Sequence, residues 1–270
     1  MALQPLNDAQ IEQFHRDGYL IVKDCVPAEQ VKRVRHIAER DPQLQSDAKF
    51  NQNYEDEGVG TRLVYRDQLE DDVYSAYARS QYMVGPIQQL FGDAMRHYYH
   101  LQMLKDPQTG GWQWHQDYGY HYKEFFYPDF VSLMLALDPC NRENGCLRVL
   151  RGSHRLGRLE HQSSGSQLIA DPERVSWAHK EMEEVHCEMT PGSVLYFHGN
   201  LLHASHPNHS TQPRWSMVCA YVTASNTCVL PEVEEKLGTS LDPWSEKQVI
   251  ESSLRHERIV EKTQQTDAAV

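Results

Sequence analysis

Residues 97–117 read HYYHLQMLKDPQTGGWQWHQD and show the texture of the middle of this chain. A β-rich run at 98–104 is followed by the turn signal Asp106-Pro107 and by a second short run at 111–117. The same alternation continues toward the C-terminus. It predicts further strands at residues 130–137, 146–150, 185–189, 194–197, 201–204 and 215–222. Short strands with this punctuation are typical of a β-sandwich or barrel.

Helical signals flank this β region on both sides. Asn7 or Asp8 can cap a helix that runs toward Arg16, and Pro27 can begin another that reaches about residue 40. A strand is expected between them at 19–22. A helix from about 72 to 91 is expected to be interrupted at Gly85-Pro86.

We expect the 270 residues to form a single domain, in which the segments between the predicted helices and strands are polar. Residues 41–72 are expected to form a loop that could lie over a site. The expected parts are a helical part at 1–95, a β core at 96–225 with a polar insert at 154–184, and a helical tail that frays at its end at 226–270.

Composition narrows the class of protein. The chain is 40% hydrophobic and 24% charged with a net charge of -12, as in a soluble globular protein. Its 26 basic residues are outnumbered by 38 acidic ones, which disfavours nucleic acid as a partner. No apolar run approaches the roughly 20 residues that span a membrane, and the first residues lack the pattern of a secretory signal. We expect a cytoplasmic protein without a membrane partner; its oligomeric state is open.

The chemistry is concentrated around His115 and Asp117. These residues are two apart on a predicted strand, where side chains two apart share a face. His203, on a later predicted strand, is the expected third ligand. Two histidines and a carboxylate form the facial triad of non-haem Fe(II) oxygenases. The alternative for the His-x-Asp pair is a polar strand end satisfied by backbone groups.

Arg214 follows His203 on the next predicted strand, with Ser216 on the same side. An arginine inside a barrel needs an anionic partner, because an unpaired buried guanidinium is costly. A dicarboxylate co-substrate would be such a partner. The alternative is a structural arginine paired with an acidic side chain.

Several phrases together resemble a known family. They are HQDY (115–118), RENGCLRVLRGSH (142–154), PGS (191–193) and LHAS (202–205) followed by Arg214. Their order and spacing resemble the phytanoyl-CoA dioxygenase family of Fe(II)/2-oxoglutarate oxygenases over roughly residues 8–225. The resemblance implies a mainly β fold with flanking helices around a double-stranded β-helix, the jelly-roll or cupin-like core.

The resemblance also implies roles for individual residues. His115, Asp117 and His203 would be the iron ligands and catalytic centre, and Arg214 would pair with the distal carboxylate of 2-oxoglutarate. Ser205 would hydrogen-bond the same co-substrate, with Ser216 as a further candidate. Iron(II) would be the metal, with 2-oxoglutarate and O2 as co-substrates. The carboxylate of Asp117 favours hydroxylation over halogenation. From the 41–72 segment, Arg62 is a candidate to assist.

Tyrosines crowd the His-x-Asp region, and the chain offers basic residues nearby. We take Tyr99, Tyr120 and Lys105 as candidate substrate contacts. Aromatic faces attract ammonium groups and basic side chains bind anions, so we expect a small polar substrate, for example a zwitterionic aminophosphonate such as 2-aminoethylphosphonate.

Other functions stay open. They are an acyl-CoA or natural-product hydroxylase of the same family, a cupin-type oxygenase without 2-oxoglutarate, and a silent binding barrel.

The other histidines of this region are expected to have no part in the metal site. His198 and His206, on either side of His203, are interpreted as ordinary strand or loop residues. His121, His161 and His179 fall in predicted loops, and their spacing indicates no role.

Overall fold

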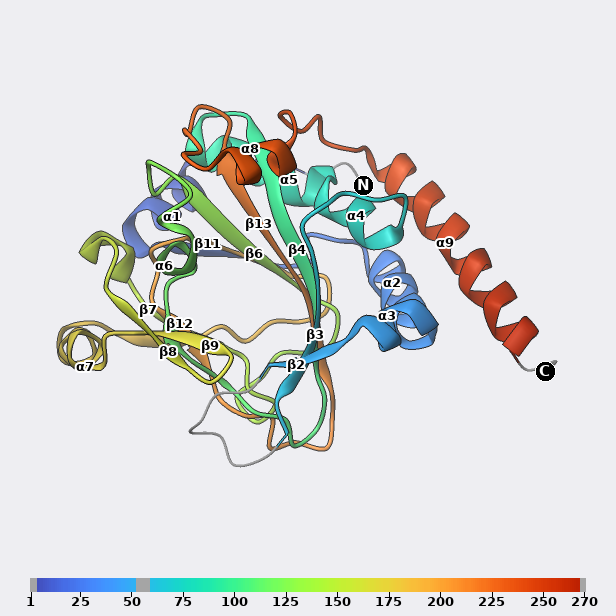
Figure 1. Ribbon diagram of the computed structural model, residues 1–270, viewed down its shortest axis with the longest axis horizontal. Coiled ribbons are helices and arrows are strands. Elements are labelled where there is room, and N and C mark those ends of the chain that lie inside the picture. The colour runs from blue at the N-terminus through green and yellow to red at the C-terminus, as the bar shows by residue number, and fades with distance from the viewer. Residues whose placement is uncertain (1–3, 52–58, 268–270) are drawn as a thin grey trace.

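The computed structural model describes residues 4–51 and 59–267. Two antiparallel sheets form its centre (Figure 1). The larger sheet contains β1 (Tyr19–Val22), β2 (Lys49–Asn51), β3 (Thr61–Arg66), β4 (Met95–Lys105), β6 (Phe130–Ala136), β11 (Val194–His198) and β13 (Arg214–Thr223). The smaller sheet contains β5 (Trp112–His115), β7 (Leu147–Leu150), β10 (Glu184–His186) and β12 (His203–Ser205).

Strand order shows the jelly-roll character of this core. The larger sheet runs β1-β11-β6-β13-β4-β3-β2, and the smaller one runs β10-β7-β12-β5. Strands distant in sequence are therefore neighbours, as in the double-stranded β-helix that the sequence resemblance implied. All eight strands predicted between residues 98 and 222 are present, with shifts of a few residues at their ends.

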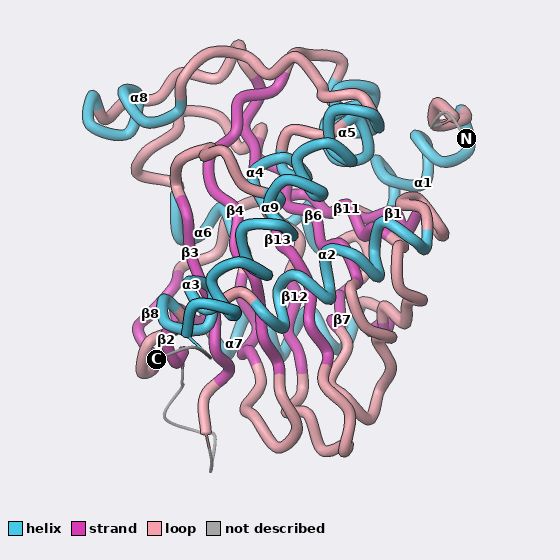
Figure 2. The backbone as a smooth tube through the Cα atoms, turned by 90° about the vertical axis from the view of Figure 1, so that its right-hand side faces the viewer, coloured by secondary structure: helices cyan, strands magenta, loops and turns pink. Residues whose placement is uncertain are grey.

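Helices cover the outer face of the larger sheet, where α2, α4, α5 and α9 lie in front of the strands in Figure 2. The helices are α1 (Asp8–Asp17), α2 (Ala28–Arg40), α3 (Pro42–Asp47), α4 (Val73–Ala78), α5 (Gln81–Phe91), α6 (Asp117–His121), α7 (Pro172–Glu181), α8 (Pro231–Leu237) and α9 (Glu246–Asp267). None of the helices in the described residues combines the length and apolar character that a membrane crossing needs.

Strand β6 contributes side chains to two hydrophobic clusters, one on each face of the larger sheet. Every residue of this strand is buried. Leu133 and Leu135 belong to the cluster that includes Val34 and Ile37 of α2. Met134 and Ala136, on the opposite face, belong to a second cluster with Leu195 and Phe197 of β11. Because side chains alternate along a strand, an uninterrupted apolar run is what such a doubly covered strand requires.

The interpretation of residues 41–72 as a loop is wrong for much of that segment. It contains α3, β2 and β3, and β3 pairs with β4 along Arg62–Arg66. Its charged residues obscure a strand whose central residues, Leu63 to Tyr65, are apolar or aromatic. Residues 52–58 of that interpretation lie outside the described residues.

The helix predicted at 72–91 is interrupted at a different place. Helix α4 ends before Arg79 and Ser80 occupies the N-cap position of α5, whereas Pro86 lies inside α5. Proline has no N–H for the carbonyl four residues earlier, here that of Tyr82. The hydroxyl of Tyr196 donates to this carbonyl at 2.7 Å instead. A tertiary hydrogen bond therefore allows proline within the helix.

The polar insert and the tail also contain more order than expected. The insert holds the hairpin β8 (His161–Ser164) and β9 (Gln167–Ala170), followed by α7. The tail forms α8 and α9, and α9 packs on α2 and α4 rather than fraying over the residues that are described.

Candidate active site

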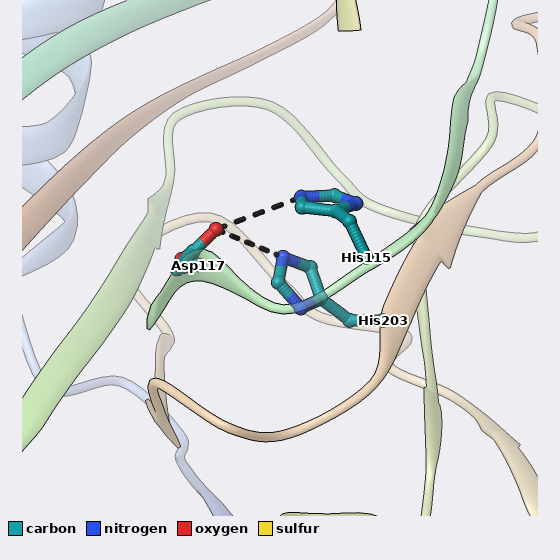
Figure 3. Close-up of side chains that lie close together, drawn as sticks. All are labelled: His115, Asp117 and His203. Carbon is teal, nitrogen blue, oxygen red and sulfur yellow. Dashed lines mark ion pairs between the residues drawn. The ribbon is translucent and has the colours of Figure 1, made fainter. Parts of the chain in front are cut away.

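Three potential metal ligands meet in a cavity lined by residues of both sheets. Figure 3 shows the side chains of His115, Asp117 and His203 turned toward one another. Asp117 Oδ1 lies 3.5 Å from His115 Nε2 and 3.4 Å from His203 Nε2. One ligand atom from each residue lies within 4.8 Å of the others. Within the described part of the chain, no other group of three or more potential His, Cys, Asp or Glu ligands is gathered in this way.

Pairing within the smaller sheet brings the two histidines together. His115 ends β5, His203 begins β12, and the two residues lie directly opposite each other. The Nδ1 atom of His115 is 2.6 Å from the carbonyl of Gln113, and that of His203 is 2.9 Å from the carbonyl of Leu201. These backbone contacts orient both rings and leave both Nε2 atoms for a metal.

The prediction that His115 and Asp117 share one face of a strand is wrong in its geometry. Strand β5 ends at His115, and Asp117 is the first residue of α6. The backbone turns at Gln116, and this turn brings the carboxylate back to the imidazoles. The two residues converge as expected, but through a strand-to-helix junction.

Gln116, between the two ligands, is fully buried and fixes this junction. Its Nε2 donates at 2.7 Å to the carbonyls of both Gly157 and Asn200, and its Oε1 accepts from the amide of Leu159 at 2.7 Å. The side chain therefore joins the turn to the segments that lead into β8 and β12.

His161, interpreted from the sequence as a loop histidine without a role, begins β8 and supports the same turn. Its Nε2 accepts a hydrogen bond from the amide of Gln116 at 3.0 Å. The ring lies so close to Gly119 that a β-carbon there would fall 2.1 Å from it. Glycine is needed at 119 for this approach, and nothing in the local sequence pattern indicated it.

The protonation states suit a metal. Burial lowers the pKa of His115, which keeps its imidazole neutral. Burial alone would raise the pKa of Asp117, but its interactions with the neighbouring His203 and His115 side chains hold it well below its usual value. The hydroxyl of Ser132 donates to Asp117 Oδ2 and fixes the carboxylate. A neutral imidazole and an ionised carboxylate are the forms that bind metals, and this donor set fits iron(II) with open positions.

Arg214 lines the same cavity, is 1% exposed and makes no ion pair with a carboxylate of the described residues. Its Nη1 and Nη2 atoms lie 3.6 and 3.8 Å from the sulfurs of Met134 and Met103, and its Nε has no hydrogen-bond partner. The alternative of a structural arginine paired with an acidic side chain is therefore not what this geometry shows. An anion in the cavity would satisfy the guanidinium.

Ser205 lines the same cavity as Arg214, whereas Lys105 is not among the lining residues. Lys105 is directly opposite Arg214 in the pairing of β4 and β13. Its Nζ donates to Ser205 Oγ at 3.0 Å and also to the carbonyl of His206. Ser216 is buried with its hydroxyl unpartnered among the described residues, but it does not line the cavity.

The cavity of about 280 Å³ has an aromatic wall. Tyr99 and Tyr120, both expected as substrate contacts, line it. The hydroxyl of Tyr120 is already engaged, because it donates to the carbonyl of Leu168 and accepts from the amide of the same residue. Only the ring of Tyr120 is left to face a ligand. Tyr65 and His121 also line the cavity, and the sequence interpretation had left both outside the site.

His198 and His206, on either side of His203, lie outside the group of three potential ligands in the described part of the chain. His198 accepts from the amide of Asn200 at 3.0 Å, and His206 lies near His186 with rings 6.4 Å apart. Arg62, the candidate from the 41–72 segment, pairs with Asp106 at 2.8 Å and does not line the cavity.

This fold and this set of side chains define a non-haem iron oxygenase with a facial triad inside a double-stranded β-helix. The family model described as Phytanoyl-CoA dioxygenase (PhyH) matches residues 14–216. The chain belongs to this family, and it is a 2-oxoglutarate-dependent dioxygenase that uses iron. This excludes the cupin-type oxygenase without 2-oxoglutarate and the silent barrel.

Three of the similar proteins are named for reactions of small molecules. An ectoine dioxygenase of Halomonas elongata is 27% identical over 86% of this chain and 74% of its own length. An L-proline trans-4-hydroxylase of Streptomyces griseoviridis is 25% identical over 84% and 90%. A methylphosphonate hydroxylase of Gimesia maris is 24% identical over 80% of each chain.

Solved structures support the fold. The crystal structure of EctD from S. alaskensis with bound Fe superposes with a TM-score of 0.74 over 91% of this chain and 89% of that chain, at 20% identity. The similarity includes the flanking helices as well as the β core, because it extends over nearly the whole chain.

Proposed function

We propose that this chain hydroxylates an unactivated C–H bond of a small polar, zwitterionic metabolite, with His115, Asp117 and His203 holding iron and Arg214 binding the distal carboxylate of 2-oxoglutarate. The observation that carries the co-substrate assignment is the buried guanidinium of Arg214, which shares the cavity with the triad and lacks an acidic partner among the described residues. A dicarboxylate that reaches from the metal to Arg214 satisfies both ends of this arrangement.

The protein's own groups bind and orient the co-substrate. Ser205 Oγ accepts a hydrogen bond from Lys105, whose ammonium can only donate. The hydroxyl proton of Ser205 is therefore directed away from Lys105 and is available to a carboxylate on the cavity side. Lys105, first considered as a substrate contact, becomes a positioning residue for Ser205. The sulfurs of Met103 and Met134 hold the guanidinium in place before the co-substrate binds.

Iron with bound 2-oxoglutarate supplies the oxidation: one O2 converts the co-substrate to succinate and CO2 and the substrate C–H to C–OH. His115 and His203 are at most 5% exposed, which limits the access of bulk water to the metal position.

Cavity size and lining support a small substrate. The volume of about 280 Å³ must hold 2-oxoglutarate as well, and it lies below the roughly 300–1,000 Å³ common for drug-sized ligands. The aromatic wall offers ring faces to a cation. The relatives named for ectoine, L-proline and methylphosphonate support the same size class. An aminophosphonate combines this size with both charges.

The test is a turnover screen with Fe(II), 2-oxoglutarate and O2. We expect 2-aminoethylphosphonate, ectoine or L-proline to give one succinate per product molecule that has gained one oxygen atom. Arg214→Met at the same 2-oxoglutarate concentration is the control, and it should lose most of this succinate. Turnover of phytanoyl-CoA, with none of the small compounds oxidised, would overturn the proposed substrate class.

A further inference from the structure

His121 belongs to a polar network at the cavity wall that the iron and co-substrate sites do not use. It ends α6, and its Nδ1 lies 2.9 Å from the hydroxyl of Tyr98 and 3.4 Å from Glu124 Oε2. The Tyr98 hydroxyl also donates to Glu124. His121 lines the cavity, whereas Tyr98 and Glu124 lie behind it and do not.

The hydrogen-bond donors in this network can be assigned. Burial alone would raise the pKa of Glu124, but hydrogen bonds from His121 and Tyr98 lower it, so the carboxylate is ionised and can only accept. Burial and the neighbouring Glu124 raise the pKa of Tyr98, so its hydroxyl keeps its proton and gives it to Glu124. The contact between Tyr98 and His121 then requires Nδ1–H of His121 to donate to the phenolic oxygen.

This assignment fixes the chemistry that His121 presents to the cavity. A histidine ring that carries its single proton on Nδ1 presents Nε2 as a hydrogen-bond acceptor. It has no hydrogen-bond partner among the described residues, and the groups held by Nδ1 lie outside the cavity lining. The negative charge of Glu124 stands directly behind the ring.

The neighbouring rings favour the same kind of ligand. The ring of Tyr99 lies 5.1 Å from that of Tyr65 and 5.7 Å from that of His121. The ring of Tyr120 lies 5.6 Å from that of His115, so Tyr65, Tyr99 and Tyr120 form a row of rings along this wall, called the arc below. Ring faces attract cations, so the arc and the acceptor of His121 both suit a positively charged N–H group beside the metal ligands.

We propose that His121 Nε2 accepts a hydrogen bond from a cationic nitrogen of the substrate, an ammonium or amidinium, with Glu124 as the balancing charge and the rings of Tyr65 and Tyr99 against the cation. The assignment rests on the proposed function and deepens it, because it names the substrate group that the enzyme recognises and the residue that recognises it. Compounds of the same size without a charged N–H group are poor substrates.

The test compares 2-aminoethylphosphonate with ethylphosphonate, which differs only by the amine, and adds ectoine and L-proline as further cationic compounds. His121→Phe removes the acceptor but keeps a ring to stack on Phe130, where the present rings are 5.6 Å apart and nearly parallel. Glu124→Gln removes the charge and keeps one acceptor oxygen for the network. The matched control is His179→Phe, since His179 contacts Trp114 edge-on and does not line the cavity.

In His121→Phe we expect KM for the cationic substrate to rise by about 10- to 100-fold, the value of a hydrogen bond to a charged group, while KM for 2-oxoglutarate stays within about twofold. Glu124→Gln should shift KM in the same direction by a smaller factor, and His179→Phe should leave it unchanged. Thermal unfolding and the Fe(II)–2-oxoglutarate absorption band show that each variant retains its fold and co-substrate site.

Two results would overturn the inference and leave the proposed function intact. One is an unchanged KM in both His121→Phe and Glu124→Gln. The other is wild-type turnover of ethylphosphonate equal to that of 2-aminoethylphosphonate. Absence of succinate formation with every small compound would overturn both the inference and the proposed function.

Discussion

Replacement of Arg214 by methionine separates two effects that its burial predicts. The guanidinium is 1% exposed and has no carboxylate partner among the described residues. It therefore lowers the stability of the protein without co-substrate and strengthens the binding of the co-substrate. Loss of one partner from a buried charge pair costs about 2–4 kcal/mol, which corresponds to a Kd for 2-oxoglutarate that is about 30- to 700-fold higher. The protein without co-substrate should become about 1–3 kcal/mol more stable, because methionine fills the site without a charge.

Calorimetric titration of 2-oxoglutarate into the anaerobic Fe(II) protein, together with urea unfolding of the protein without co-substrate, measures both effects. Arg62→Met is the matched control, since Arg62 on β3 pairs with Asp106 at 2.8 Å and lies outside the cavity lining. It should leave the affinity unchanged and lower stability by at most about 1 kcal/mol. Unaltered 2-oxoglutarate affinity in Arg214→Met would refute the reasoning.

Two further predictions concern iron binding and pH. Ser132→Ala removes the donor to Asp117 Oδ2, so the Kd for Fe(II) should rise by about 10- to 100-fold while kcat at saturating iron is largely kept; an unchanged iron titration would contradict this role. His97 and His100 are buried in contact, and burial lowers their pKa values to about 2 and about 3 from 6.5. As the pH falls, the unfolded chain binds protons at these histidines before the folded chain does. The contribution of the two neutral histidines to the free energy of unfolding is therefore full above about pH 6.5, and it is lost progressively as the pH falls toward their pKa values in the folded protein. Urea unfolding should show that the free energy of unfolding falls between pH 7.5 and pH 5.5, and that this fall is about 1 kcal/mol smaller in His97→Gln than in the wild-type protein. Equal falls in the two proteins would argue against this role of His97.

The features that could be predicted from the sequence are those with a local signature. Short apolar runs separated by Asp-Pro, Asn-Gly and Pro-Gly turns indicated the eight core strands. The His-x-Asp pair, the later His203 and the arginine after it carry their spacing in the chain itself. The resemblance then connected them, and the structure brings the triad and Arg214 to one cavity.

The features that were missed depend on contacts between distant segments. His161 supports Gln116 across a gap of 45 residues, and His121 gains its role only from Tyr98 on another element. Pro86 was taken as a break because the hydroxyl of Tyr196 that satisfies the freed carbonyl comes from a strand 114 residues after Tyr82. Periodicity and spacing carry no information on such partners.

Lys105 shows the limit of residue type as a guide. A lysine near a tyrosine-rich strand suggested a substrate contact, but its ammonium lies behind Ser205 and is held by that hydroxyl and by a carbonyl. A lysine is suited to binding an anion, but the pairing of β4 with β13 places Lys105 opposite Arg214. There it contacts Ser205 instead of the substrate.

Anaerobic visible spectroscopy tests the iron and co-substrate site most directly. The purified protein is titrated with Fe(II) and then with 2-oxoglutarate, alongside Asp117→Ala and Arg214→Met. We predict a weak charge-transfer band that forms only after 2-oxoglutarate is added, is absent in Asp117→Ala, and needs much more 2-oxoglutarate in Arg214→Met. A protein that binds iron but gives no band, or gives the same band in Asp117→Ala, would contradict the assignment of this site.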